Sequence, residues 1–456
     1  MSDKTPFTKE EEISYIDKLL KYFRNPDPES SARMKYGAEL YRKGMLSYQL
    51  INSDGTPYNG TAKVCFTQKS HEFEFGCNGF MLKGFQTEEE NQAYEKYFKR
   101  LFNLMVIPFY WGDLEPEEGK PRYAKDSPYI YRRPSPDLLL EFCEQNGITP
   151  KGHVLLYDHH TAKWLKRDTA EHLKRIYERH VREIAERYGD KIYNWDVTNE
   201  VTYHTPSQII PEDFAHFAFK IAEKYFPVST RFNYNDGNSW RDTYGYYSVD
   251  NMLENWLLLD NCKVDAIGLQ YHMIGCPDVK NMLPWWGEYY FNPEHINNVL
   301  DIWTKVGKPV SISEVTITGR EDLGTEFCEE FQRFCTEILY KIWFSHPNTN
   351  GIIWWNLVDD TALGVENQAK GGLIHRDMTP KPAYRQLEKM LLNDWNTNCT
   401  NDYDSTKKNY VRGYYGTYNI TIELPDGKVF HTEEKIVSGR KNEAKIIIPD
   451  DCGGKC

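Results

Sequence analysis

Two glutamates stand at the ends of apolar segments, where a buried strand would release a polar side chain. Glu200 closes the run NWDVTNE at 194–200, and Glu314 closes PVSISE at 309–314. In a barrel of parallel strands the chemistry takes place at the carboxyl ends of the strands, so two such residues can converge on one substrate. Glycoside hydrolysis needs such a pair, one carboxyl protonated as the acid and the other ionised as nucleophile or base.

The separation of the two carboxyl groups decides between retention and inversion at the sugar carbon, and repulsion between them helps to raise the pKa of the acid. Either glutamate alone could equally be a solvated loop residue or half of an ion pair. The pair together, with Asn199 beside Glu200, favours the catalytic interpretation.

Elements that could position this pair alternate between residues 72 and 395. The sequence predicts strands at 73–78, 103–109, 149–157, 194–200, 231–236, 265–272, 309–315 and 351–357, and helices at 88–102, 136–146, 168–188, 212–225, 248–260, 293–306, 325–345 and 380–394. Strands each followed by a helix predict an α/β fold, the (β/α)8 TIM barrel. A doubly wound open sheet is the alternative, but GCNGFMLKGF at 76–85 does not fit its GxGxxG phosphate turn.

Shorter β-type runs lie outside the predicted barrel. They occupy 46–52, 61–68, 415–423, 428–432 and 444–448, and the turn-forming residues between the first two and between the next two predict hairpins. Isolated hairpins are marginal in water, so we expect the strands of both chain ends to meet in one small accessory β-module packed on the barrel. The predicted organisation is a helical then loop-like segment at 1–35, module strands at 36–71, the catalytic barrel at 72–395 and further module strands at 396–456.

Composition excludes several classes of protein. A chain of 456 residues holds one large barrel with additions, and the formal net charge of −12 with scattered Lys and Arg argues against nucleic acid as a partner. No run approaches about 18 apolar residues, so we expect no membrane span. The first twenty residues are polar and acidic, without the pattern of a signal peptide, which predicts a cytoplasmic protein unless a signal was removed. The ten cysteines form no CxxC pair and predict no disulfide framework.

Several motifs together resemble glycoside hydrolase family 10, the family of endo-β-1,4-xylanases. They are KGHVLLYDHHTAKWL at 151–165, NWDVTNE at 194–200, DAIGLQYH at 265–272, SISEVTI at 311–317, LEPEEG at 114–119 and KPAY at 381–384. They occur in order along the whole barrel. The resemblance implies a retaining hydrolase that cleaves β-1,4-xylosidic bonds of xylan or decorated xylo-oligosaccharides by double displacement.

The resemblance also implies roles for individual residues. Glu200 would be the acid/base, Glu314 the nucleophile, and Asn199 the partner of the sugar 2-hydroxyl. His153, Gln270 and His272 would hydrogen-bond the reacting sugar or the nucleophile, Trp355 would be the stacking wall under that sugar, and Trp164 and Trp111 match other aromatic positions of the family. For His153, His272 and Gln270 a purely structural role is the alternative.

The sequence departs from the family pattern around this pair. Ile107 and Tyr110 stand where the family has Asn and Lys, Tyr157 and His160 where it has Trp and Gln, and Thr316 where it has Asp, so that His272 would lack that Asp as a carboxylate partner. We therefore expect altered sugar subsites and a substrate such as short or decorated xylan fragments, or a related β-linked glycan.

Other questions stay open at this stage. Another retaining hydrolase acting on glucan, mannan or galactan, and a sugar-binding barrel without activity, are the competing interpretations. Endo or exo action and the oligomeric state cannot be read from the sequence. Trp285 and Trp286 could form an outer sugar platform or cap the barrel edge. We expect no cofactor, and no metal at Asp158, His159 and His160, because adjacent histidines on such a loop point apart.

Overall fold

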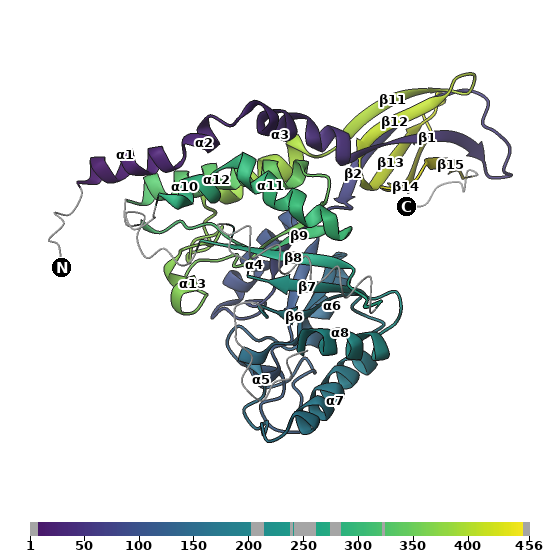
Figure 1. Ribbon diagram of the computed structural model, residues 1–456. Coiled ribbons are helices and arrows are strands. Elements are labelled where there is room, and N and C mark those ends of the chain that lie inside the picture. The colour runs from purple at the N-terminus through teal and green to yellow at the C-terminus, as the bar shows by residue number, and fades with distance from the viewer. Residues whose placement is uncertain are drawn as a thin grey trace.

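The computed structural model describes residues 8–201, 214–237, 240, 261–273, 284–321 and 324–449. Its centre is a closed barrel of parallel strands in the order β10-β3-β4-β5-β6-β7-β8-β9 (Figure 1). The strands are β3 (Glu74–Asn78), β4 (Leu104–Pro108), β5 (Thr149–Leu156), β6 (Asn194–Asn199), β7 (Arg231–Asp236), β8 (Ala266–His272), β9 (Val310–Thr316) and β10 (Thr349–Trp354). The predicted TIM barrel and its eight strands are confirmed, with small differences at the strand ends.

Helices follow the barrel strands and cover the outside of the barrel. They are α4 (Glu88–Leu101), α6 (Pro136–Asn146), α7 (Ala170–Tyr188), α8 (Phe214–Tyr225), α11 (Pro293–Trp303) with the 3-10 turn η3 (Thr304–Val306), α12 (Thr325–Ser345), and α14 (Pro382–Lys389) with the π turn η5 (Met390–Asp394). Each matches a predicted helix, whereas the predicted helix at 248–260 lies outside the described residues. Short helices α5 (Trp111–Leu114), η1 (Asp158–His160), α10 (Trp285–Tyr289) and α13 (Gly364–Gln368) lie in loops.

Helix α7 shows how the sequence specifies these elements. The Thr169 hydroxyl accepts a hydrogen bond from the His172 backbone N–H at 3.2 Å and caps the first turn. The buried residues Tyr177, Val181 and Ile184 then recur at helical spacing and face the barrel.

Successive side chains of a barrel strand enter two different parts of the core, one inside the barrel and one between the barrel and the helices. On β4, Leu104 and Val106 belong to the cluster inside the barrel that also contains Trp355. Met105 and Ile107 belong instead to the large core between barrel and helices. Ile107, which stands where the family has Asn, therefore points away from the barrel interior, because successive side chains on a strand point to opposite faces.

The strands of the two chain ends form a β-sandwich, which confirms the predicted accessory module. One sheet has the order β12-β1-β15 and the other β11-β2-β13-β14. Their bounds are β1 (Lys43–Asn52), β2 (Thr61–His71), β11 (Asn398–Asp404), β12 (Asn409–Tyr414), β13 (Gly416–Glu423), β14 (Val429–Ile436) and β15 (Asn442–Ile448). Side chains from both sheets, among them Leu50, Phe66 and Tyr418, fill the shared core.

Strand pairing in the sandwich differs from the prediction at its N-terminal half. The predicted hairpin of 46–52 with 61–68 is wrong, because β1 and β2 lie in different sheets. Each of them alternates buried and exposed residues, so the two strands can cover the core from opposite sides. The β13–β14 hairpin is confirmed by its antiparallel register, and β11 and β12 are additional strands that the sequence analysis did not predict.

The N-terminal helices run from the loop before α11 to the sandwich. They are α1 (Lys9–Leu19), α2 (Lys21–Arg24) and α3 (Pro28–Tyr41), and they lie beside α10, α11 and α12 (Figure 1). The prediction that the segment ending at residue 35 becomes loop-like is wrong, since α3 is helical through Tyr41. Gly37 permits close packing of α3 on α12, because a Cβ there would lie 2.3 Å from the Ser345 carbonyl oxygen.

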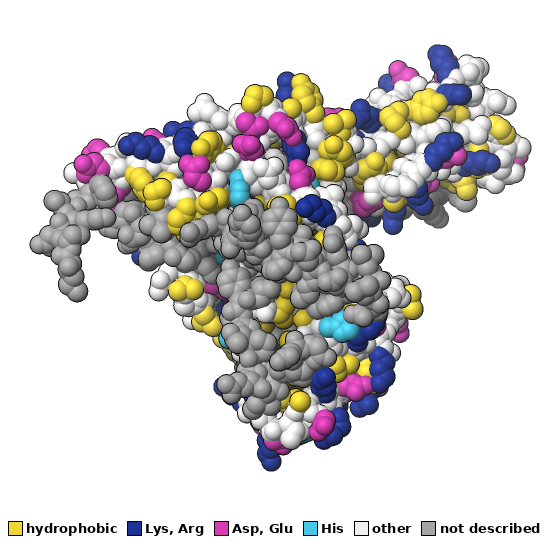
Figure 2. Space-filling model, in the orientation of Figure 1, with side chains coloured by type: hydrophobic (Ala, Val, Ile, Leu, Met, Phe, Trp, Pro, Cys, Tyr) yellow, Lys and Arg dark blue, Asp and Glu magenta, His cyan; other side chains and the backbone are white. Residues whose placement is uncertain are grey.

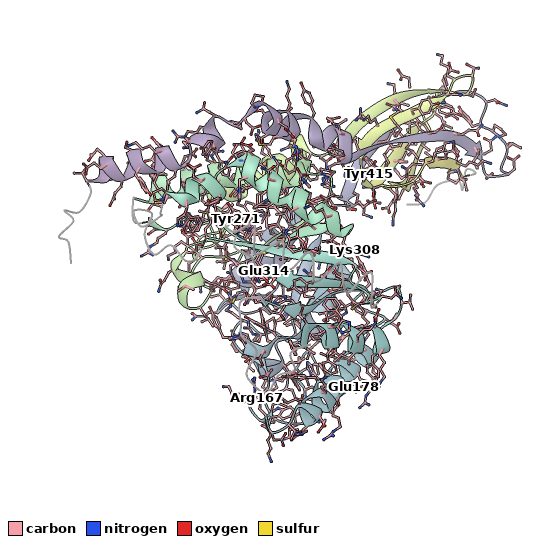
Figure 3. The ribbon with its side chains drawn as sticks, in the orientation of Figure 1. Arg167, Glu178, Tyr271, Lys308, Glu314 and Tyr415 are labelled. Carbon is pink, nitrogen blue, oxygen red and sulfur yellow. The ribbon has the colours of Figure 1, made fainter. Side chains whose placement is uncertain are left out.

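The sandwich packs near the end of the barrel where the strands begin. A cavity of about 350 Å³ is lined both by Tyr415 and Ser438 of the sandwich and by Pro309, immediately before β9. Figure 3 labels Tyr415 on the same side as Lys308, with Glu314 further away in the barrel. On the face seen in Figure 2, Lys and Arg side chains are interspersed with Asp and Glu and form no single basic patch.

Candidate active site

The carboxyl ends of β6, β8 and β9 bring both predicted glutamates to one amide. Nε2 of Gln270 donates to Oε1 of Glu200 at 3.0 Å and to Oε1 of Glu314 at 3.1 Å. The two carboxyl oxygens are therefore closer together than the sum of those two distances. Figure 3 shows Glu314 near the middle of the barrel.

Glu200 has an unusual backbone conformation. Its φ of 53° lies in the left-handed region, which is uncommon for residues other than glycine, asparagine and aspartate. Its backbone N–H donates to the Asn235 carbonyl oxygen at 3.1 Å, which ties the end of β6 to β7. Such conformations cost about 1–3 kcal/mol and cluster at functional sites.

Glu314 is buried, and amides from neighbouring strands hold its carboxyl group. Nδ2 of Asn235 donates to Oε1 of Glu314 at 2.9 Å and to Oδ1 of Asn199 at 2.7 Å. The side chain of Glu314 is only 5% exposed, so these bonds replace those that water would make. Sequence reasoning missed Asn235, whose signal is a polar residue near the end of the predicted strand RFNYND.

His272 contacts the other oxygen of Glu314. Its Nε2 lies 3.1 Å from Oε2 of Glu314, and its Nδ1 lies 2.9 Å from the hydroxyl oxygen of Thr316. Burial lowers the pKa of His272, but the hydrogen bond and negative charge of Glu314 outweigh it, so the net pKa is raised. As the sequence predicted, position 316 gives His272 a hydroxyl in place of a carboxylate.

His153 is held by a buried ion pair below the site. Its Nδ1 lies 2.9 Å from Oδ2 of Asp196, whose Oδ1 lies 2.9 Å from Nζ of Lys151. Burial alone would raise the pKa of Asp196, but the charge of Lys151 and the hydrogen bond of His153 lower it. Nε2 of His153 is buried and has no hydrogen-bond partner within the part of the chain that is described.

Rings from the loops after β4 and β5 gather beside Glu200. The ring centroids of Tyr110 and His160 are 4.8 Å apart, those of Tyr157 and His160 are 5.3 Å apart, and Tyr157 donates its hydroxyl to Oε2 of Glu200. The Arg133 guanidinium lies 4.1 Å from the Tyr110 ring centroid. Sequence reasoning did not single out Arg133, because a lone arginine in a loop carries no distinctive pattern.

Trp355 lies at the same site, whereas two other predicted tryptophans do not. The Trp355 ring is buried edge-on to His153, with centroids 5.4 Å apart. Trp111 stacks on His180 at 4.1 Å and donates its indole N–H to Oε2 of Glu115. Trp164 donates its indole N–H to the Glu115 carbonyl oxygen at 2.8 Å. The structure thus places Trp111 and Trp164 around Glu115 and not against the two catalytic candidates.

The paired tryptophans of α10 divide between two environments. Trp285 and Trp286 are stacked with centroids 5.1 Å apart. Trp286 is buried against Tyr290, whereas Trp285 is half-buried. Helix α10 also packs on α1, because Gly287 lies against the backbone of Leu19.

The described residues offer neither a metal site nor a membrane span. They contain no cluster of three or more His, Cys, Asp or Glu side chains able to hold a metal ion, and Asp158 instead pairs with Arg167 at 3.0 Å. None of their helices combines the length and apolar character needed to cross a membrane.

Comparison with known proteins places this site in a family. Residues 72–390 match the sequence model of glycosyl hydrolase family 10. The chain is 24% identical over 398 residues to anti-sigma-I factor RsgI6 of Acetivibrio thermocellus, covering 86% of this chain and 46% of that protein. It is 26% identical over 292 residues to endo-1,4-beta-xylanase B of Cellvibrio japonicus, covering 62% of this chain and 43% of the relative. The chain thus spans less than half the length of both relatives.

Solved structures share the fold. Xylanase 10B from Thermotoga maritima superimposes with a TM-score of 0.55 at 21% identity, covering 71% of this chain and 96% of that chain. Xylanase 10B from Thermotoga petrophila in complex with xylobiose gives a TM-score of 0.56 at 20% identity, covering 71% of this chain and 95% of that chain. Since the family match spans the barrel and includes both Glu200 and Glu314, the chain belongs to glycosyl hydrolase family 10.

Proposed function

We propose that this chain is a retaining glycoside hydrolase that cleaves β-1,4-xylosidic bonds in xylan or decorated xylo-oligosaccharides, as an endo-1,4-β-xylanase does. The observation that carries the proposal is the Gln270 amide that binds both Glu200 and Glu314. Retaining enzymes place their two carboxyl groups about 5–5.5 Å apart and inverting enzymes about 6.5–9.5 Å apart. One bridging nitrogen keeps the bonded oxygens below the inverting range.

The two glutamates have different roles in the proposed double displacement. Glu314 attacks the anomeric carbon while Glu200 gives its proton to the leaving glycosidic oxygen. The ionised Glu200 then takes a proton from water, which attacks the same carbon and releases Glu314. Asn199, Gln270 and Nε2 of His153 supply hydrogen bonds for the hydroxyls of the reacting sugar, and Trp355 provides an apolar wall.

The surroundings of the pair support a substrate other than plain polymeric xylan. Tyr110, Tyr157 and His160 form a ring cluster where the family pattern has Lys, Trp and Gln, and Arg133 lies on Tyr110. Rings favour stacking over hydrogen bonding to hydroxyls. We expect the enzyme to turn over short or decorated xylo-oligosaccharides faster than unbranched xylan; equal or faster turnover of unbranched xylan would contradict this preference.

Nucleophile rescue tests the mechanism directly. Glu314→Ala should abolish hydrolysis of an aryl β-xyloside, and added azide should restore turnover with an α-xylosyl azide as product, because azide attacks from the face that Glu314 has vacated. Glu200→Ala with azide should give the β-xylosyl azide. Glu178→Ala, on the outer face of α7, is the control. Products of the wrong anomeric form, identified by NMR, would contradict the assignment of these roles.

A sugar-binding protein without turnover is the second candidate. Two relatives were described above. The one that covers more of this chain is named as an anti-sigma factor and not as an enzyme. Binding of xylo-oligosaccharides by calorimetry, together with no turnover of any xylan, glucan, mannan or galactan substrate, would favour this function over hydrolysis.

A further inference from the structure

The two oxygens of Glu200 are held from two different strands. Gln270, on β8, donates to Oε1 at 3.0 Å, and Tyr157, immediately after β5, donates its hydroxyl to Oε2. The amide of Gln270 also binds Glu314, so that contact serves both glutamates. Among the hydrogen bonds described above, the one from Tyr157 therefore reaches Glu200 and not Glu314.

Building on the proposed function, we propose that Tyr157 is a positioning residue that keeps Glu200 oriented in both of its protonation states. A phenol hydroxyl is both a donor and an acceptor of hydrogen bonds. It can donate to Glu200 when the carboxylate is ionised, and it can rotate to accept the proton of Glu200 when that group is an acid. An amide nitrogen such as that of Gln270 can only donate.

The reaction needs both states in turn. In the first step Glu200 transfers its proton to the glycosidic oxygen, the bond from the anomeric carbon to that oxygen breaks, and a bond to Glu314 forms. In the second step water gives a proton to Glu200, its oxygen bonds to the anomeric carbon, and the bond to Glu314 breaks. The Tyr157 proton stays on its own oxygen throughout, so atoms and charge balance without it.

The environment of Tyr157 keeps its hydroxyl protonated. Burial is the first cause that raises the pKa of Tyr157, and the negative charge of Glu200 raises it further. Among the described residues, the ionisable groups that face this pair include Tyr110, His159 and His160 beside the Tyr157 ring, and Glu314 and His272 across the site. Glu314 and Tyr110 raise the pKa of Tyr157 as well, so both of them oppose a phenolate.

The effect of removing the hydroxyl has a definite sign. A hydrogen bond to a charged acceptor is stronger than one between neutral groups. The hydroxyl therefore stabilises the ionised form of Glu200 more than the protonated form. Tyr157→Phe should move the titration of Glu200, and with it the alkaline limb of kcat/KM, upward by about one pH unit.

Two measurements on the 456-residue chain test this. The first follows Glu200 by NMR in protein labelled with ¹³C at glutamate carboxyl carbons, with Glu200→Gln identifying its signal. The second is the pH profile of kcat/KM for an aryl β-xyloside. Tyr225→Phe is the matched control, because Tyr225 donates to Glu178 at 2.7 Å in a tyrosine–glutamate pair on the outer helices.

The outcomes separate this inference from the proposed function. An upward shift of the Glu200 titration in Tyr157→Phe, with none in Tyr225→Phe, supports the role of Tyr157 even if the parent protein hydrolyses nothing. An unchanged Glu200 titration in a folded Tyr157→Phe overturns it, even if the parent is an active xylanase. The alkaline limb must follow the NMR shift in an active protein; a fixed limb also overturns the role.

Discussion

Thr316 occupies the place of a charged partner for His272, because its hydroxyl oxygen lies 2.9 Å from Nδ1 of that imidazole. The other ring nitrogen faces Glu314 at 3.1 Å. His272 thus has a carboxylate on one side and a neutral hydroxyl on the other. The protonation of the imidazole is governed mainly by burial and by Glu314.

Thr316→Asp should therefore raise the pKa of His272 further, by about one unit or more, because a second carboxylate would lie within hydrogen-bonding distance. The shift is measured as the imidazole titration by NMR. Thr316→Asn is the matched control, since it has nearly the same shape without the charge. Equal titrations in the two variants would show that the carboxylate does not reach His272.

Gln270 joins the two glutamates, so its amide should matter to the whole reaction. Gln270→Leu removes the amide that donates to both Glu200 and Glu314 and puts an apolar side chain of similar size in its place. We expect kcat/KM to fall by about two to three orders of magnitude, since each lost bond to a charged group is worth about 1.5–3 kcal/mol.

The control for this prediction lies on the outer surface. Gln386→Leu on α14 removes an amide that contacts Arg333 and should leave kcat/KM unchanged. A loss of less than tenfold in Gln270→Leu, with an unchanged melting temperature, would mean that the bridging amide is not needed.

The sequence was sufficient to place the two glutamates but not all their partners. Glu200 and Glu314 follow apolar strands, and parallel strands release such residues at one end of a barrel. Asn235 is also a polar residue near a strand end, but an asparagine there can face the site or the protein interior, so its position alone did not identify it. The direction of Trp111 was equally hidden, since its burial on His180 depends on α7, far away in the chain.

Long-range pairing was the second limit of sequence reasoning. Strand patterns identified β1 and β2 locally, but their partners β12, β15, β11 and β13 come from the other end of the chain. Proximity in the sequence favours a hairpin, and nothing in the 53–60 connection indicates that it crosses between sheets. The strand β11 was missed because its residues, NCTNDYD, are mostly polar.

A side chain added at position 268 is predicted to disturb the active site by displacing Asn235. A Cβ at position 268 would lie 2.2 Å from Oδ1 of Asn235, so Gly268→Ala must displace the amide that donates to Glu314 and Asn199. We expect kcat/KM to fall at least tenfold, because a small displacement of a positioning group is costly to catalysis. The measurement is kcat/KM together with the melting temperature.

Gly307→Ala separates backbone strain from this effect. Gly307 is at φ +70° with open space around its Cβ position, so the substitution strains the backbone far from Glu314. It should lower the melting temperature with kcat/KM intact. If Gly268→Ala also lowered the melting temperature without changing kcat/KM, the displacement of Asn235 would not be what affects catalysis.

The ion pair below His153 should control stability more than any surface pair. Lys151 and Asp196 each have side chains only 2% exposed, and their charged atoms are 2.9 Å apart. Asp196→Asn leaves the Lys151 ammonium buried without its counter-charge, which should lower the free energy of unfolding by about 3–5 kcal/mol at pH 7. Urea denaturation measures this change. Lys151→Met combined with Asp196→Asn should recover part of the loss, because no buried charge then remains.

The pH dependence of this effect has a fixed sign. Although burial acts to raise it, the pKa of Asp196 is lowered below its ordinary value of 3.8 by Lys151 and His153. The stability that this carboxylate contributes is therefore present above that value and is lost as the pH falls through the lowered pKa. The gap in unfolding free energy between the parent and Asp196→Asn should narrow in that acidic range. A gap that stayed constant down to acid unfolding, or a double variant no more stable than Asp196→Asn, would show that the loss does not come from the uncompensated charge of Lys151.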